Sequence, residues 1–204
     1  IDYFCTATPM GITPEFWVQF GIPKEKIYIT NHHNAHCYGA YYTSGFNEKT
    51  LVVSYDAGGI SKSMGYTSTF GRTFLAENNK INLVNSWPMG TSTSIPCMYA
   101  MITRWLGWRI NKDEGKVTGL AGYGEYNKDI YESFEKLCWY SKEEKRFLPA
   151  HHAESATGIN IVLDYLTRTQ VLKDMSDEKS RADLAYNMQL FLENRMVEYF
   201  NHLH

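Results

Sequence analysis

Three histidines within five residues, His32-His33-Asn34-Ala35-His36, constrain this chain more than any other feature. They follow the alternating stretch 26–30, which predicts a short strand, and they lead into 34–43, which predicts a helix that Gly45 ends. His32 and His36 are four residues apart, and on a helix this spacing places both imidazoles on one face, close enough to share one ion. Ligand sites of α/β folds tend to lie just after a strand and at the start of a helix. The pattern therefore predicts an α/β fold with a metal site at this point.

A carboxylate is available to the same site from Asp56, which follows the apolar, β-branched run 51–55. This run predicts a buried strand, and we expect it to lie beside strand 26–30 so that both strand ends open on one cleft. Gly58 and Gly59 come directly after Ala57, and glycines let a backbone approach a phosphate closely. The stretch predicts a nucleotide- or adenylate-binding cleft with Asp56 as a metal ligand. A plain hairpin turn is the alternative, because Asp and Gly are also turn residues.

A second glycine-rich stretch, 114–124, carries one lysine and one glutamate among its glycines. It lacks the full GxxxxGK[ST] pattern, so it is not a P-loop. Lys116 can pair with a phosphate or a carboxylate, and Glu114, Lys116 and Gly119 are our candidates for contacts with a nucleotide. A tightly turned connection between two helices explains the glycines equally well.

The order of the other predicted elements divides the chain into an α/β part, 1–92, which holds the metal site, and a mainly helical continuation, 93–204. In the first part we expect a β-meander with turns at Gly71 and at Asn78-Asn79. The predicted meander strands are 63–70, 72–77 and 81–86, and the further helices are 12–20, 94–107, 127–140, 158–169 and 176–202, with a short element at 115–120.

Bulk properties exclude several classes of protein. The formal net charge of −2 gives no support to a broad nucleic-acid surface. The four cysteines form no CxxC pair, which favours free thiols in a reducing cytoplasm over a disulfide framework. No apolar run approaches the roughly 20 residues that span a bilayer. We therefore expect a cytoplasmic protein without a membrane partner.

Several motifs, taken in order, resemble one family. They are the histidine cluster, the strand that ends in Asp56 with its glycines, Ser94-x-Pro96-x-x-Tyr99, Leu106-Gly107-Trp108 and the stretch 114–124. Together they resemble the NodU/CmcH family of O-carbamoyltransferases, whose N-terminal domain is similar to Kae1/TsaD proteins. The resemblance runs from about residue 27 to residue 124 and continues more weakly through the final helix. In place of the family's Asp-Gly-x-Gly-Glu, this chain has Asp-Ala-Gly-Gly-Ile.

The resemblance implies a fold class, a reaction and a set of ligands. The fold would be a fragment of an actin-like ATPase domain (ASKHA, Kae1-like), made of a β-meander and a helical subdomain. His32, His36 and Asp56 match the family's metal ligands; the metal would be iron, with zinc, manganese or magnesium as alternatives. The metal would engage carbamoyl-adenylate, which a YrdC-like domain, in cis or in trans, makes from carbamoyl phosphate and ATP. The carbamoyl group would pass to a hydroxyl of a small-molecule acceptor, with His33 as the candidate general base and Lys116 as a second catalytic candidate.

Two other functions stay open at this point. One is threonylcarbamoyl transfer to tRNA, as in the related Kae1/TsaD branch. The other is a non-catalytic role, in which the chain is an inactive fragment that docks onto a partner supplying a missing lobe. The chain begins with Ile1 and lacks the family's first hairpin and second lobe, so we expect it to be a piece of a longer enzyme.

Overall fold

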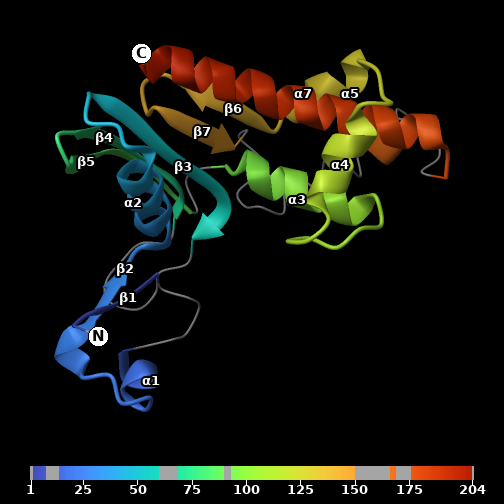
Figure 1. The fold of residues 1–204 in the computed structure, drawn as a ribbon. Helices are drawn as coiled ribbons and strands as arrows, with labels where there is room; N and C mark the ends of the chain where they lie inside the picture. Colours follow the sequence, from blue (N-terminus) through green and yellow to red (C-terminus); the bar gives the residue numbers. More distant parts are fainter. Residues whose placement is uncertain are drawn as a thin grey trace. The chain divides into compact units, whose positions relative to one another are not determined.

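The computed structural model describes residues 2–7, 14–59, 69–89, 93–149, 166–168 and 176–203. These divide into two compact units, Ile1–Met89 and Gly90–His204, which are described separately (Figure 1). The described elements mix helices with strands, so the predicted α/β class is confirmed. Among the described residues, none of the helices combines the length and the apolar character needed to cross a bilayer.

The first unit opens with a small parallel pair of strands. β1 (Phe4–Ala7) pairs with β2 (Ile27–Thr30), and α1 (Pro14–Val18) and the 3-10 turn η1 (Lys24–Lys26) lie between them in the chain. The ring of Trp17 in α1 lies 4.6 Å from that of Phe4, which holds the short helix against the strand pair. Strand 26–30 and the helix after Pro14 are confirmed. The proposed start of that helix at residues 12 and 13 falls outside the described residues.

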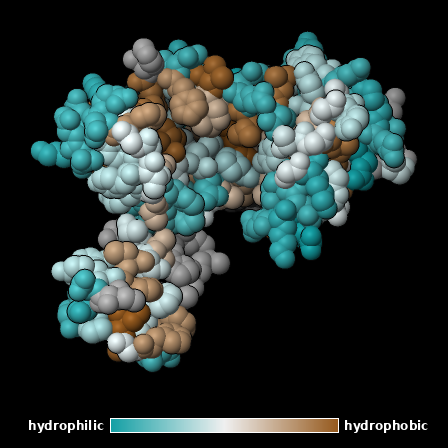
Figure 2. All heavy atoms as spheres, viewed as in Figure 1, coloured by the Kyte–Doolittle hydropathy of each residue, from teal (hydrophilic) through white to brown (hydrophobic). Residues whose placement is uncertain are grey.

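Exposed aromatic side chains gather on this small part of the unit. Figure 2 shows brown and tan surface over α1, and four aromatic residues there are each more than a third exposed: Tyr3, Phe16, Phe20 and Tyr28. Their rings also contact one another, as in the edge-to-face pair of Tyr3 and Tyr28 at 5.4 Å. These side chains are therefore only partly shielded from water within the described structure.

Helix α2 (His32–Ser44) begins two residues earlier than the sequence predicts. The cause is Asn31, whose side-chain oxygen accepts hydrogen bonds from the backbone N–H groups of His33 and Asn34 and so caps the helix. Gly45 ends it with a φ of 77°, as predicted from the sequence. The earlier start brings all three clustered histidines into the first two turns of the helix.

A three-stranded antiparallel sheet among the described residues forms the rest of this unit, in the order β3 (Thr50–Gly59), β4 (Thr69–Glu77), β5 (Lys80–Pro88). The predicted turn at Asn78-Asn79 is confirmed: both residues have positive φ, and they close a two-residue hairpin between β4 and β5. The first predicted meander strand, 63–70, lies mostly outside the described residues.

Two predictions about this sheet are wrong. Gly71 is not a turn but an interior position of β4, where the Trp87 ring lies so close that a Cβ would come within 2.4 Å of it. Strand β3 does not pair with β2: among the described residues, β2 lies in the sheet β1-β2 and β3 lies in the sheet β3-β4-β5. Helix α2 lies between β2 and β3 in the chain and packs on β3 and β4.

The second unit contains α3 (Ile95–Trp105), α4 (Glu114–Ala121), α5 (Lys128–Glu135) and α7 (Glu178–Leu203), with a hairpin of β6 (Cys138–Ser141) and β7 (Arg146–Pro149). Side chains cap the starts of α3 and α7: Ser94 accepts from the Cys97 N–H, and Asp177 accepts from the Ser180 N–H. Of the predicted helix 158–169, the structure describes residues 166–168, which are helical.

The predicted helix 127–140 is too long. It ends at Glu135, and the following residues form β6, whose Tyr140 packs its ring 5.3 Å from that of Phe147 in β7. Cys138, Tyr140 and Phe147 are buried, and the rings of Tyr140 and Phe147 contact that of Tyr199, so α7 covers the apolar face of this hairpin. The alternation of aromatic and polar residues in this stretch fits a strand as well as a helix. Periodicity alone therefore did not distinguish the two, and the helix was predicted too long.

The chain that follows α4 passes close to the backbone of α7. Gly124 lies directly against α7, and a Cβ at this position would come within 2.1 Å of the Ala182 carbonyl oxygen. A hydrogen-bonded chain adds α3: the Tyr99 hydroxyl donates to Gln189 Oε1 at 3.0 Å and contacts Thr118 Oγ1 at 2.7 Å. At least one glycine of the stretch 114–124 is therefore required by helix packing.

Candidate metal centre

Helix α2 lies on one face of the sheet β3-β4-β5 and contacts it with residues spaced four apart, His33, Cys37 and Tyr41 (Figure 1). At one end of this contact Cys37 and Tyr41 pack on apolar side chains of the sheet. That apolar cluster is completed by Val52, Phe74 and Ala76. The helix is therefore anchored by its second half, and its first half carries polar side chains over the same strands.

Three ligand-type atoms converge where α2 passes the end of β3. His32 Nε2 lies 2.9 Å from Asp56 Oδ2 and 3.1 Å from His36 Nε2. His36 Nε2 lies 3.9 Å from Asp56 Oδ2. All three side chains are half-buried or exposed, so the cluster is open to solvent on one side. The structure thus brings together the three residues that the sequence singled out as metal ligands.

The donor set fits a shared divalent cation. Ligand atoms bound at about 2.1 Å in tetrahedral or octahedral geometry lie about 3.0–3.4 Å apart, close to the shorter two separations here. Hydrogen bonds alone do not account for the cluster, because His32 Nε2 carries at most one proton and has both Asp56 and His36 beside it. A cation among the three atoms would accept an electron pair from each. Two imidazoles and one carboxylate suit iron, zinc or manganese.

The carboxyl of Asp56 is held in its charged form. Burial opposes ionisation, but hydrogen bonds from His32 and from the Ala57 N–H, together with the nearby imidazoles, outweigh it and lower the pKa of Asp56 below its usual range. A carboxylate that stays ionised is the form in which Asp binds a metal.

Irregular pairing places Asp56 at this position. The ladder between β3 and β4 is regular up to Tyr55 and Gly71, then shifts before it resumes at Gly59 and Thr69. Asp56 and Gly58 lie in this bulge, and Gly58 has a φ of 154°. Gly58 also faces Met89, whose terminal methyl would collide with a Cβ. The two glycines expected to contact a nucleotide therefore lie close to Asp56 in the chain, Gly58 within the bulge and Gly59 where the pairing resumes.

His33 points away from the cluster and into the sheet. It is fully buried, its Nε2–H donates to the Thr69 carbonyl at 2.8 Å, and its Nδ1 accepts from the Ser54 hydroxyl at 2.8 Å. The tautomer follows from chemistry, because a carbonyl can only accept. Burial lowers the pKa of His33, so the ring is neutral. Its expected role as general base is not favoured by this arrangement, because both nitrogens are already engaged.

The candidates from the second glycine-rich stretch belong to the other unit. Glu114 opens α4, where it accepts from the Asn111 N–H, and Lys116 pairs with Asp113 at 3.1 Å. Gly119 lies in the same helix with open space where a side chain would be. The predicted short element is thus an α-helix, and the nucleotide contacts expected of these three residues stay predictions.

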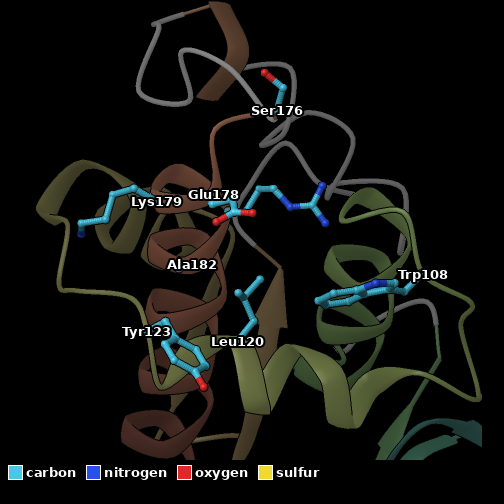
Figure 3. A pocket seen from close by; sticks show the side chains of 8 residues that line it. Trp108, Leu120, Tyr123, Ser176, Glu178, Lys179 and Ala182 are labelled. Carbon is cyan, nitrogen blue, oxygen red and sulfur yellow. The ribbon is translucent and has the colours of Figure 1, made fainter.

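The second unit also has a hollow of about 660 Å³ between the end of α4 and the start of α7 (Figure 3). Trp108, Leu120 and Tyr123 form its apolar wall, and Arg181 lies over the Trp108 ring at 5.9 Å while donating to the Leu106 carbonyl. None of the candidate site residues named from the sequence lines this hollow.

Sequence reasoning missed the residues that hold α2 in place. Ser54 and the Thr69 carbonyl bind His33, and Arg72 donates to the Asn34 side chain at 2.8 Å. One sequence pattern could have found Ser54. It lies two residues after Val52 and two residues before Asp56, and residues spaced by two along a strand share one face. The second partner of His33, the Thr69 carbonyl in β4, could not be predicted, because its position depends on the register between β3 and β4.

Comparison with known proteins identifies the family. The family model described as "Carbamoyltransferase N-terminus" matches residues 20–204. An uncharacterized protein of Methanocaldococcus jannaschii, MJ1058, is 30% identical over 183 residues, which cover 87% of this chain and 29% of that protein. The nodulation protein NolNO of Sinorhizobium fredii is 29% identical over 123 residues, covering 58% of this chain and 16% of that protein. The chain spans less than a third of either relative, and it belongs to the family of carbamoyltransferase N-terminal domains.

Proposed function

We propose that this chain forms the metal-holding part of an O-carbamoyltransferase. The observation that carries the proposal is the convergence of His32, His36 and Asp56, within 4.8 Å of one another, in a member of the carbamoyltransferase N-terminal family. The three ligands come from a helix and a strand that pack on each other, so the site belongs to the folded unit.

The proposed substrate of the site is carbamoyl-adenylate, and the proposed metal is iron(II), with zinc, manganese and magnesium as alternatives. A divalent cation supplies charge that polarises carbonyl and phosphate oxygens. The protein residues have the other tasks: His32 and His36 offer neutral nitrogen ligands, and Asp56 stays ionised and offsets part of the metal charge. Gly58 and Gly59 have no side chains of their own beside the proposed ligands, and this property of glycine supports the proposal that a phosphate approaches the backbone there.

The complete reaction requires parts that we place elsewhere in a longer enzyme or in partner chains. We propose that a YrdC-like domain makes the adenylate from carbamoyl phosphate and ATP, and that the carbamoyl group passes to a hydroxyl of a small-molecule acceptor. The mixed α/β unit with its antiparallel sheet supports a further proposal, that the domain is part of an actin-like ATPase fold of the Kae1 type.

The test is direct binding. The chain is purified without metal and titrated anaerobically with Fe²⁺, Mn²⁺ or Zn²⁺ in a calorimeter, and the metal-loaded chain is then titrated with a non-hydrolysable carbamoyl-adenylate analogue. We expect one metal per chain, and binding of the analogue that depends on the metal.

The His32→Ala/His36→Ala double variant removes two of the three proposed ligands. The matched control is His202→Ala, which removes a histidine of the other unit. The double variant should lose the metal and His202→Ala should keep it. Metal binding that survives in the double variant would overturn the assigned ligands, and a wild-type chain without any metal affinity would overturn the proposed function.

A further inference from the structure

His33 is the polar member of an otherwise apolar contact stripe. It shares the buried face of α2 with Cys37 and Tyr41, and like them it is almost completely removed from solvent. Burying an imidazole is unfavourable unless both nitrogens are hydrogen-bonded, and here both are. An apolar side chain could fill the same place without hydrogen-bond partners. What His33 adds at this position is a pair of directional hydrogen bonds.

These two bonds connect α2 to two different strands. The Ser54 hydroxyl belongs to β3 and the Thr69 carbonyl to β4, and each lies 2.8 Å from a nitrogen of the same ring. Two fixed bonds in different directions restrict both rotation of the helix about its axis and sliding along the sheet. Apolar packing at Cys37 and Tyr41 is less directional and does not set the rotation by itself.

The bonded atoms lie next to the metal ligands in the chain. His33 follows His32 and shares the first turns of α2 with His36, while Ser54 precedes Asp56 by two residues on the same side of β3. Any shift between His33 and Ser54 therefore moves both imidazoles relative to the carboxylate. The separations of 2.9 Å between His32 Nε2 and Asp56 Oδ2 and of 3.9 Å between His36 Nε2 and Asp56 Oδ2 depend on this alignment.

We propose that His33, held by Ser54 and the Thr69 carbonyl, is a positioning residue that sets the affinity and the coordination geometry of the metal bound by His32, His36 and Asp56. The inference rests on the metal-binding part of the proposed function. It gives His33 a task that needs no contact with substrate and no change in its protonation.

The test uses Co²⁺ as the probe, because its visible absorption reports coordination geometry as well as occupancy. Metal-free wild type, Ser54→Ala and His33→Gln are titrated with Co²⁺, and the dissociation constant and the absorption bands are recorded. The matched control is Ser44→Ala, which removes a hydroxyl from the opposite end of α2, where it donates to the Tyr41 carbonyl. Far-UV circular dichroism and the melting temperature of the metal-free proteins measure folding separately.

We expect Ser54→Ala and His33→Gln to weaken Co²⁺ binding by about 10- to 100-fold and to change the absorption bands, while Ser44→Ala changes neither. Wild-type affinity and wild-type bands in folded Ser54→Ala and His33→Gln would overturn this inference and leave the proposed function intact. If both variants are unfolded, His33 is a folding determinant and the inference is also overturned. If the wild-type chain does not bind Co²⁺, the proposed metal site is itself overturned.

Discussion

The carboxylate of Asp56 lies 2.9 Å from the imidazole of His32, although 24 residues separate them in the chain. One residue begins a helix and the other lies in a strand bulge, so the contact exists only because α2 packs on the sheet. The site therefore depends on the tertiary structure of the first unit. Substitutions of the proposed ligands and substitutions of the residues that pack α2 on the sheet should both affect it.

Removal of the Asp56 charge should abolish stabilisation by metal. A ligand present at about 100 times its dissociation constant stabilises a folded protein by about 2.7 kcal/mol. We expect wild type to show this gain with Mn²⁺ or Zn²⁺ and Asp56→Asn to lose most of it, whereas the metal-free melting temperatures should differ little because Asp56 is partly exposed. Thermal unfolding with and without metal measures both. An equal metal-induced shift in Asp56→Asn and in the control Glu77→Gln, at the far end of β4, would contradict the assignment.

Two glycines near each other in the chain should respond to alanine in opposite ways. Gly124→Ala places a methyl group against the Ala182 carbonyl and should cost about 1–3 kcal/mol, because the α4–α7 contact must open. Gly119→Ala places its methyl in open space within a helix and should stabilise by about 0.5–1 kcal/mol. Urea unfolding at neutral pH gives both values. The packing described for α4 and α7 would be wrong if Gly124→Ala were as stable as wild type.

Cysteine labelling should separate the exposed thiol from the buried ones. Burial raises the pKa of Cys37 to about 11 and also raises the pKa of Cys138, and thiolates are the reactive form. Cys5 is exposed. At pH 8 we expect an alkylating reagent to modify Cys5 well before Cys37 or Cys138, which should react only after addition of denaturant. Peptide mass mapping over time follows each site, and early modification of Cys37 would contradict the docking of α2.

Asp113 should make stability sensitive to acid. Hydrogen bonds from the Arg109 side chain and N–H, and the ion pair with Lys116, lower the pKa of Asp113 in the folded chain. A depressed pKa means that its contribution is complete above the unfolded value of about 4 and is lost as pH falls through the folded value. We expect wild type to exceed Asp113→Asn in stability at pH 7 and this difference to shrink below about pH 4.

The control for Asp113 is Asp129→Asn, which neutralises an exposed aspartate in the first turn of α5. Denaturant unfolding at several pH values is the measurement. A gap between wild type and Asp113→Asn that is the same at pH 7 and at low pH would show that the carboxylate charge is not what stabilises the start of α4.

Local sequence patterns predicted most of the helices and the pairing of His32 with His36, because these depend on spacing within a few residues. The His32/His36 pair, the stop at Gly45 and the turn at Asn78-Asn79 are of this kind. Features that depend on distant partners were mispredicted: Gly71 is packed under Trp87, and strand β6 forms because β7 returns beside it. His33 shows the same limit within the site, since its surroundings follow from the register of two strands.

The layout of α2 separates what keeps it folded from what it can bind. Its second half is secured by Cys37 and Tyr41 in the apolar cluster, whereas the ligand side chains of His32 and His36 face outward and take no part in that cluster. Exchanging a ligand, for example His36→Glu, would leave the apolar anchor untouched. The first two turns of this helix are therefore a place where the preference of the proposed metal site can be redesigned, or can drift during evolution, while the scaffold beneath stays the same.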